Sequence, residues 1–213
     1  MMYQVVIVGA GPVGGRLATE LASRGISTLM LEEHAEIGRP FQCAGLVNPP
    51  AMNMVNLHDT ILQSVDGALM HSPSGIMLPV GKDGRVRTHV VCRKRFDQGV
   101  VAQAMDAGAH LWLKSKPIDA SVTTDGVIVK VEREGEIIDL TCGLLVGADG
   151  AHSWTRRHFR MGRPKEMMIG FQADVSGLTG KDNWLEMYTG KDFEKKNSDL
   201  KKKLHFIRFS FKK

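Results

Sequence analysis

The sequence has few cysteines and no long hydrophobic run. Cys43, Cys92 and Cys142 lie far apart, and none of them forms a Cys-x-x-Cys pair. An odd and scattered set of cysteines argues against a disulfide framework and a zinc site, and is typical of a reducing cytoplasm. No apolar run approaches the roughly 20 residues of a membrane-spanning helix, and no basic leader precedes an apolar stretch. We therefore expect a cytoplasmic protein without a transmembrane segment.

Motifs of metal and hydrolase chemistry are also missing. None of the eight histidines stands at metal-ligand spacing from a second ligand. The Gly-x-Ser-x-Gly, His-Glu-x-x-His and phosphate-loop motifs are absent. We therefore expect no metal site.

Positive charge is confined to the end of the sequence. The formal net charge is +5, but residues 191–213 alone contain nine basic and three acidic residues, a net charge of +6. The other 190 residues therefore carry a net charge of −1. A basic face for nucleic acid is not supported, and we expect no nucleic-acid partner.

Two short hydrophobic runs separated by a helical pattern stand at the beginning of the sequence. Residues 3–9 and 26–32 predict buried strands, and residues 12–24 predict a helix. This βαβ order predicts a parallel sheet. The rest of the pattern predicts an irregular loop over 33–50, strands at 65–71, 76–80 and 85–91, a helix at 94–107, a strand at 110–114, a meander over 117–141, and strands at 143–148, 167–175 and 183–189.

A Gly-x-Gly-x-x-Gly motif lies between the first strand and the helix. Gly9 is suited to a tight turn, Gly11 to close approach of the backbone to a pyrophosphate, and Gly14 to close packing of helix on strand. Glu32 ends the second strand, where a carboxylate accepts hydrogen bonds from a ribose diol and disfavours a 2′-phosphate. The order of strand, glycines, helix, strand and acid predicts a dinucleotide site.

Four further segments follow one pattern together with this motif. They are EIGRPFQCAGL from Glu36, RKRFD from Arg93, the strand leading to Pro117, and GADGAHSWTR from Gly147. Over about residues 3–190 the sequence resembles FAD-dependent enzymes of the p-hydroxybenzoate hydroxylase fold. The loop after Glu32 is most similar to the archaeal geranylgeranyl reductase family, which reduces isolated double bonds of isoprenoid lipid chains.

This resemblance implies a set of FAD-binding residues. Taken alone, Arg93 is also compatible with the start of a surface helix, Cys43 with a small buried residue, and Asp149–Gly150 with a plain turn. Pro117 has no N–H and cannot donate to the adenine from its backbone. The residues implied are Gly9, Gly11, Gly14 and Gly15 at the pyrophosphate, Glu32 at the ribose, Cys43, Ala44 and Gly45 at the flavin, Arg93 at the phosphates or ribityl chain, Pro117 at the adenine, and Asp149 and Gly150 near the cofactor.

The resemblance also implies a domain division. We expect an α/β FAD-binding domain of Rossmann type over 1–64 and 92–165, and part of a β-rich substrate domain over 65–91 and 166–192. The strands at 65–91 are expected to pair with those at 167–189. Residues 193–213 are rich in Lys and Phe and do not follow the family's pattern. This tail is explained by a truncated or frame-shifted reading frame, by a basic aromatic segment on an anionic membrane, or by a solvated charge run.

The function implied is an FAD-dependent reductase of geranylgeranyl chains, represented here by an N-terminal piece. It would take an isoprenoid lipid as substrate and electrons from an external donor. The catalytic residues are not identified by this reasoning, and Cys43 is a weak candidate. The alternatives are a flavin monooxygenase or quinone-linked dehydrogenase of the same fold, or an inactive dinucleotide-binding fragment.

Overall fold

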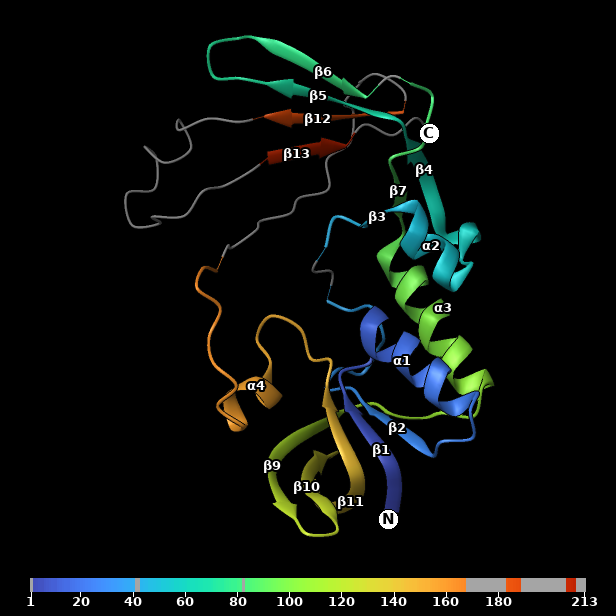
Figure 1. The fold of residues 1–213 in the computed structure, drawn as a ribbon, viewed down its shortest axis with the longest axis vertical. Coiled ribbons are helices and arrows are strands. Elements are labelled where there is room, and N and C mark those ends of the chain that lie inside the picture. The colour runs from blue at the N-terminus through green and yellow to red at the C-terminus, as the bar shows by residue number, and fades with distance from the viewer. Residues whose placement is uncertain (1, 41–42, 82, 168–182, 189–205, 210–213) are drawn as a thin grey trace. The chain divides into compact units, whose positions relative to one another are not determined.

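The computed structural model describes residues 2–40, 43–81, 83–167, 183–188 and 206–209. The chain forms two compact units (Figure 1). The first unit contains residues 1–41 and 93–163, and the second contains residues 42–92 and 164–213. No helix within the described residues is long and apolar enough to span a membrane.

A six-stranded sheet forms the first unit, in the order β8-β2-β1-β11-β10-β9. Strand β1 lies between β2 and β11 and is parallel to both, and β2 is parallel to β8. Strand β10 is antiparallel to β11 and β9. The bounds are β1 Met2–Val8, β2 Thr28–Leu31, β8 His110–Trp112, β9 Ser115–Thr123, β10 Gly126–Arg133 and β11 Glu136–Gly147.

Helices α1 (Pro12–Ala22) and α3 (Arg93–Asp106) pack together on one face of this sheet (Figure 1). Alternate residues of β1 belong to different cores, as the strand period of two requires. Ile7 packs with Ala18 of α1 and Ala104 of α3, whereas Val6 packs with Val129 of β10. A short helix, α4 (Trp154–His158), follows the end of β11.

These observations confirm the predicted order of strand, helix and strand and the parallel pairing at β8, β2, β1 and β11, whereas β10 and β9 make the sheet mixed. Two predicted strands, the end of the 117–141 meander and the run at 143–148, form the single strand β11. The pattern is split at Gly143, but the backbone there continues to pair, since Cys142 lies opposite Tyr3 and Leu144 lies opposite Val5.

Two small sheets form the second unit, together with helix α2 (Pro49–Val55) and the short 3₁₀ turn His58–Thr60. One sheet is antiparallel, in the order β3-β7-β4. The other has the order β13-β12-β5-β6, with β12 parallel to β5. The bounds are β3 Leu46–Val47, β4 Ile61–Val65, β5 Gly67–His71, β6 Met77–Gly81, β7 Thr88–Val91, β12 Trp184–Tyr188 and β13 Phe206–Phe209.

The predicted pairing of early and late strands is confirmed for β5 and β12, where Trp184 lies opposite Gly67. It is wrong for the strand predicted at 85–91, because β7 pairs with β3 and β4 instead. The strand predicted at 167–175 lies almost wholly outside the described residues. Helix α2 begins at the end of the loop predicted over 33–50 and continues to Val55, where no element was predicted; Asn48 caps its first turn by accepting a hydrogen bond from the Ala51 N–H.

The boundary between the two units also differs from the expected one. The prediction ended the first segment at residue 64, whereas residues 42–64 group with the second unit. Pairing of β3 and β4 with β7 holds this segment in the second unit. Of the tail, the structure describes residues 206–209, which form β13 antiparallel to β12. The three explanations of the tail lie otherwise outside the described residues.

Candidate functional site

The glycine loop between β1 and α1 has the geometry of a nucleotide-binding turn. Gly9 has a φ of +98°, and a Cβ there would stand 2.6 Å from the Ala148 carbonyl oxygen. A Cβ at Gly14 would stand 2.0 Å from the Gly9 carbonyl oxygen. At Gly11, the N-terminal cap of α1, a Cβ would meet nothing within 4 Å, and no side chain caps the helix. The first turn of α1 therefore offers its N–H groups and the positive end of the helix dipole beside open backbone.

Gly15 also contributes to the packing of α1 on α3. Its N–H donates to the Gly11 carbonyl over 2.8 Å, which places it in the helix ladder. A Cβ at this position would stand 2.9 Å from Val100 Cγ1 of α3. Gly15 therefore allows the two helices to approach closely, and its place at a pyrophosphate stays a prediction.

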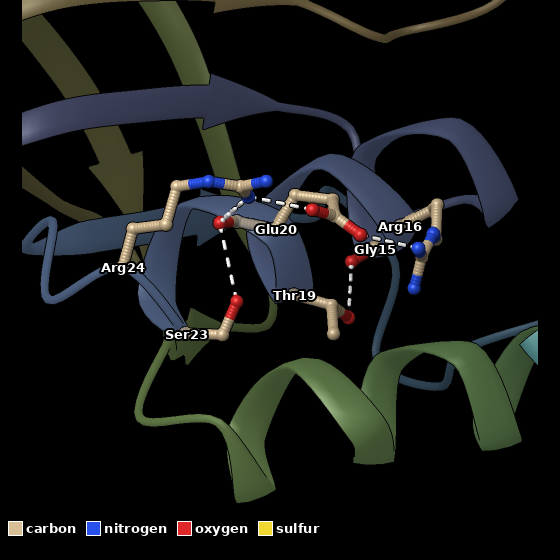
Figure 2. Close-up of polar contacts among 6 residues, drawn as sticks. All are labelled: Gly15, Arg16, Thr19, Glu20, Ser23 and Arg24. Atoms are coloured by element: carbon tan, nitrogen blue, oxygen red, sulfur yellow. Dashed lines mark hydrogen bonds and ion pairs between the residues drawn. The ribbon is translucent and has the colours of Figure 1, made fainter.

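Charges on the outer side of α1 are paired with one another (Figure 2). Glu20 forms ion pairs with Arg16 on the preceding turn and Arg24 on the following turn. The hydrogen bond from Arg24, followed by the charge of Arg16, lowers the pKa of the exposed Glu20 carboxyl. Glu20 thus holds Arg16 through one terminal nitrogen of its guanidinium, while the buried Arg16 Nε has no hydrogen-bond partner among the described residues.

Glu32 follows β2 and is bonded directly to the glycine loop. Its Oε2 accepts a hydrogen bond of 3.2 Å from the Ala10 N–H. Its Oε1 accepts one of 3.1 Å from the His34 N–H and lies 2.6 Å from His34 Nδ1. The side chain is 14% exposed. A carboxylate has four lone-pair positions, so Glu32 retains acceptor capacity for a ribose hydroxyl.

Asp149 follows β11 and stands beside the same loop. A Cβ on Gly9 would lie 2.9 Å from the Asp149 Cα. The Asp149 carboxylate accepts hydrogen bonds from the Thr155 N–H over 2.9 Å and from Thr155 Oγ1 over 3.0 Å. Burial opposes ionisation of Asp149, but the hydrogen bonds from Ser153 and Thr155 outweigh burial and lower the pKa of this carboxyl. Asp149 therefore fixes the start of α4 next to the glycine loop.

Gly9, Glu32 and Asp149 meet because β1, β2 and β11 are parallel neighbours whose carboxyl ends lie at one edge of the sheet. Ligands of open α/β sheets bind outside these carboxyl ends. Gly150 has a φ of +70°, which favours glycine, and a Cβ there would meet nothing within 4 Å.

Arg93 begins α3 and is held by an acid one turn later. Its Nε and one terminal nitrogen each donate to an Asp97 carboxylate oxygen over 2.9 Å. Asp97 is 7% exposed. A planar bidentate pair of this kind fixes the direction of the guanidinium.

The remaining predicted residues are Pro117 in the first unit and three residues of the second unit. Pro117 is a buried residue of the edge strand β9, paired with Val131 at a register shift. Proline is tolerated in sheets at such positions because it lacks an N–H. Cys43, Ala44 and Gly45 belong to the second unit. Cys43 is exposed, and the Gly45 carbonyl accepts a hydrogen bond from the Val91 N–H over 2.8 Å. Their place at a flavin stays a prediction.

Two residues at the site were missed by the sequence reasoning. Asp97 stands four residues after Arg93 on a predicted helix, and this spacing of an acid and a base was a usable signal. His34 touches Glu32 through both its backbone and its ring. The sequence does not indicate this contact, because it forms only where the chain turns after β2 and brings the His34 ring back to the Glu32 carboxylate.

The residues of the first unit fit the adenosine diphosphate part of a dinucleotide. Gly11 leaves room for phosphates beside the N–H donors of α1. Glu32 is hydrogen-bonded to the Ala10 N–H of the loop, a position from which a carboxylate can accept hydrogen bonds from a ribose.

Comparison with known proteins agrees with this geometry. The family model described as "FAD binding domain" matches residues 2–196. A digeranylgeranylglycerophospholipid reductase from Picrophilus torridus is 36% identical over 160 residues, which are 71% of this chain and 40% of that protein. The structure of a geranylgeranyl bacteriochlorophyll reductase-like protein from Thermoplasma acidophilum has a TM-score of 0.72 and 26% identity, covering 89% of this chain and 50% of that one.

A further solved structure shows the fold alone. Aklavinone-11 hydroxylase in a ternary complex with FAD and aklavinone has a TM-score of 0.69 at 20% identity, covering 88% of this chain and 41% of that one. The chain spans half the length or less of these three relatives. The predicted fold of p-hydroxybenzoate hydroxylase type and the predicted cofactor FAD are confirmed. With the family model covering most of its length, the chain belongs to the family of FAD binding domains.

Proposed function

We propose that this chain carries the cofactor-binding part of an FAD-dependent reductase that acts on isolated C=C bonds in geranylgeranyl chains of phospholipids. The observation that supports this is the bond between Glu32 and the glycine loop, in a chain 36% identical to a digeranylgeranylglycerophospholipid reductase. We assign the first unit to the FAD-binding domain and the two small sheets of the second unit to part of the substrate domain.

FAD supplies the hydride for such a reduction when it is bound and reduced. The residues of this chain bind and orient it. Gly11 and the first turn of α1 would hold the pyrophosphate, and Glu32 would accept hydrogen bonds from the adenosine ribose. Arg93, held by Asp97, would present its guanidinium to phosphate or ribityl oxygens, and Asp149 would fix the loop beside Gly9.

Reduction of an unactivated alkene develops positive charge on carbon, so the reacting bond needs a dry, apolar surrounding. Cys43, Ala44 and Gly45 are proposed to line the flavin, with Cys43 as a candidate proton donor. Cys142 is not a candidate, because it is buried in a hydrophobic core of the first unit. The substrate is an isoprenoid lipid, the electrons come from an external donor, and the protein works in the cytoplasm in peripheral contact with the membrane.

A visible absorption spectrum of the purified, gel-filtered chain tests the cofactor site. We expect a flavin spectrum that is lost in Glu32→Arg. The matched control is Glu33→Arg, which makes the same charge change at the exposed neighbouring position and is expected to retain the flavin. Loss of flavin from both variants, or from neither, would contradict the assignment of Glu32 to the ribose.

A second measurement tests the reaction. The flavin-loaded chain is reduced chemically and mixed with a geranylgeranyl phospholipid, and the lipid is analysed by mass spectrometry. Saturation of double bonds is expected. Oxygen consumption with insertion of oxygen into a substrate would instead identify a monooxygenase of the same fold.

A further inference from the structure

Strand β6 is an apolar edge strand in the part of the chain that the structure describes. It stands at the end of the sheet order β13-β12-β5-β6 and forms a hairpin with β5 (Figure 1). Each of its five residues, Met77–Gly81, is exposed. Ile76, Met77 and Leu78 are each more than half exposed. Adjacent strand residues point to opposite faces, so apolar side chains project on both sides of β6.

The backbone of β6 is poorly suited to pairing with another strand. Pro79 lies opposite Leu69 and has no N–H. Proline on an edge strand blunts the edge against addition of a further strand. Recognition of this surface therefore depends on its apolar side chains, which disfavours a second copy added edge to edge.

Positive charge follows the apolar strand. Residues 72–81 contain no charged side chain, whereas residues 82–87 contain three basic residues and one acidic residue, a net charge of +2. The Asp83 carboxylate pairs with Arg87 over 2.7 Å. Arg85 also lies near Asp83, at 3.8 Å, but its side chain is 83% exposed. Exposed apolar side chains next to exposed cations match the chemistry of an anionic lipid surface.

We propose that the β5–β6 hairpin docks the protein on an anionic lipid surface. Ile76, Met77 and Leu78 enter the headgroup region, and Arg85 meets the lipid phosphates. This inference rests on the proposed function, since a reductase of phospholipid chains must reach its substrate in a membrane. It assigns the peripheral contact to the hairpin and not to the basic tail.

Co-sedimentation with vesicles tests the docking surface. The vesicles are phosphatidylcholine with and without phosphatidylglycerol, and the full chain is used so that the tail is the same in every sample. The double variant Met77→Ser/Leu78→Ser is expected to lower the partition coefficient at least about tenfold, which corresponds to about 1.4 kcal/mol. Arg85→Gln is expected to weaken binding to the vesicles that contain phosphatidylglycerol and to leave binding to the others unchanged.

The matched control is Val122→Ser/Ile137→Ser. It removes two comparably exposed apolar side chains from the first unit and is expected to bind vesicles as the unaltered chain does. Equal loss in both double variants, or no loss in the hairpin variant, would overturn the proposal. A change from dimer to monomer in the hairpin variant, measured by light scattering, would also overturn it and identify a second copy as the occupant.

The flavin spectrum separates this inference from the proposed function. A hairpin variant that keeps its flavin but loses vesicle binding supports the docking surface. A chain that binds and reduces detergent-dispersed lipid, with vesicle binding insensitive to the hairpin, overturns the docking surface and leaves the proposed function intact. A chain that does not bind flavin overturns the proposed function, whatever the vesicles show.

Discussion

Alanine at two glycines of the α1 loop should have opposite consequences for stability and for FAD binding. At Gly14 the added Cβ would stand 2.0 Å from the Gly9 carbonyl oxygen, which is closer than real Cβ contacts come. Both groups belong to the backbone, so neither can rotate away. Overpacking of side chains costs about 1–3 kcal/mol, and we expect Gly14→Ala to exceed about 3 kcal/mol. That is a large share of the roughly 5–15 kcal/mol that stabilises a typical protein.

At Gly11 the same methyl group would meet nothing within 4 Å. The backbone there has φ −76° and ψ −175°, which any residue adopts. Loss of a glycine cap and lower entropy of the unfolded chain nearly cancel, so Gly11→Ala should change the free energy of unfolding by less than about 1 kcal/mol. The methyl group would, however, occupy the space through which a pyrophosphate approaches α1. We expect at least about tenfold weaker FAD binding.

The assay combines urea denaturation of the flavin-free chain with titration of FAD by quenching of flavin fluorescence. Gly14→Ala should lower the denaturation midpoint, whereas Gly11→Ala should keep the midpoint and raise the dissociation constant. A Gly14→Ala chain as stable as the unaltered one would refute the close packing of α1 on the loop. Undiminished FAD affinity in Gly11→Ala would refute the assignment of this open backbone to the pyrophosphate.

Two further variants test the acids that hold the site. Asp97→Asn should lower the free energy of unfolding by about 1–3 kcal/mol, which is less than for a fully buried ion pair because Arg93 is partly exposed. It should also weaken FAD binding, because the Arg93 guanidinium loses its fixed direction. Tighter FAD binding would contradict a positioning role for Asp97. Asp149 has a lowered pKa in the folded chain, so it contributes stability above its unfolded pKa of about 3.9, and this stability is lost as the pH falls through the folded value. The Asp149→Asn variant should therefore be less stable than the unaltered chain at neutral pH, and this difference in the free energy of unfolding should shrink in acid. A difference that stays constant in urea denaturation at several pH values would contradict the pH dependence expected from the lowered pKa.

Much of the candidate site could be predicted because it is encoded locally. Gly9, Gly11 and Gly14 serve a turn and the helix that follows it within a few residues, and their spacing alone indicates their tasks. The position of Glu32 at the end of the second strand follows from the strand period. Asp97 was not predicted, although its spacing of four residues from Arg93 on a helix is also a local signal.

The rest depends on contacts between distant segments. Gly15 has the same local pattern as its neighbours, but its buried position follows from the approach of Val100 of α3, which is 85 residues away in the sequence (100 − 15). Strand β7 has the pattern of a strand in either small sheet, and its pairing with β3 and β4 is decided by which partners the fold brings near. Hydrophobic alternation identifies a strand but does not specify its neighbour.

The sequence by itself determined the βαβ beginning with its parallel strands β1 and β2, the glycine loop, and the acid after the second strand. These follow from periodicity and from the conformational freedom of glycine. The tertiary structure decided that β11 joins β1 and thereby carries Asp149 to Gly9 across most of the first unit's sequence. The physical reason is that parallel strands are paired only after a long crossover, so their alignment depends on packing of the whole sheet and its helices.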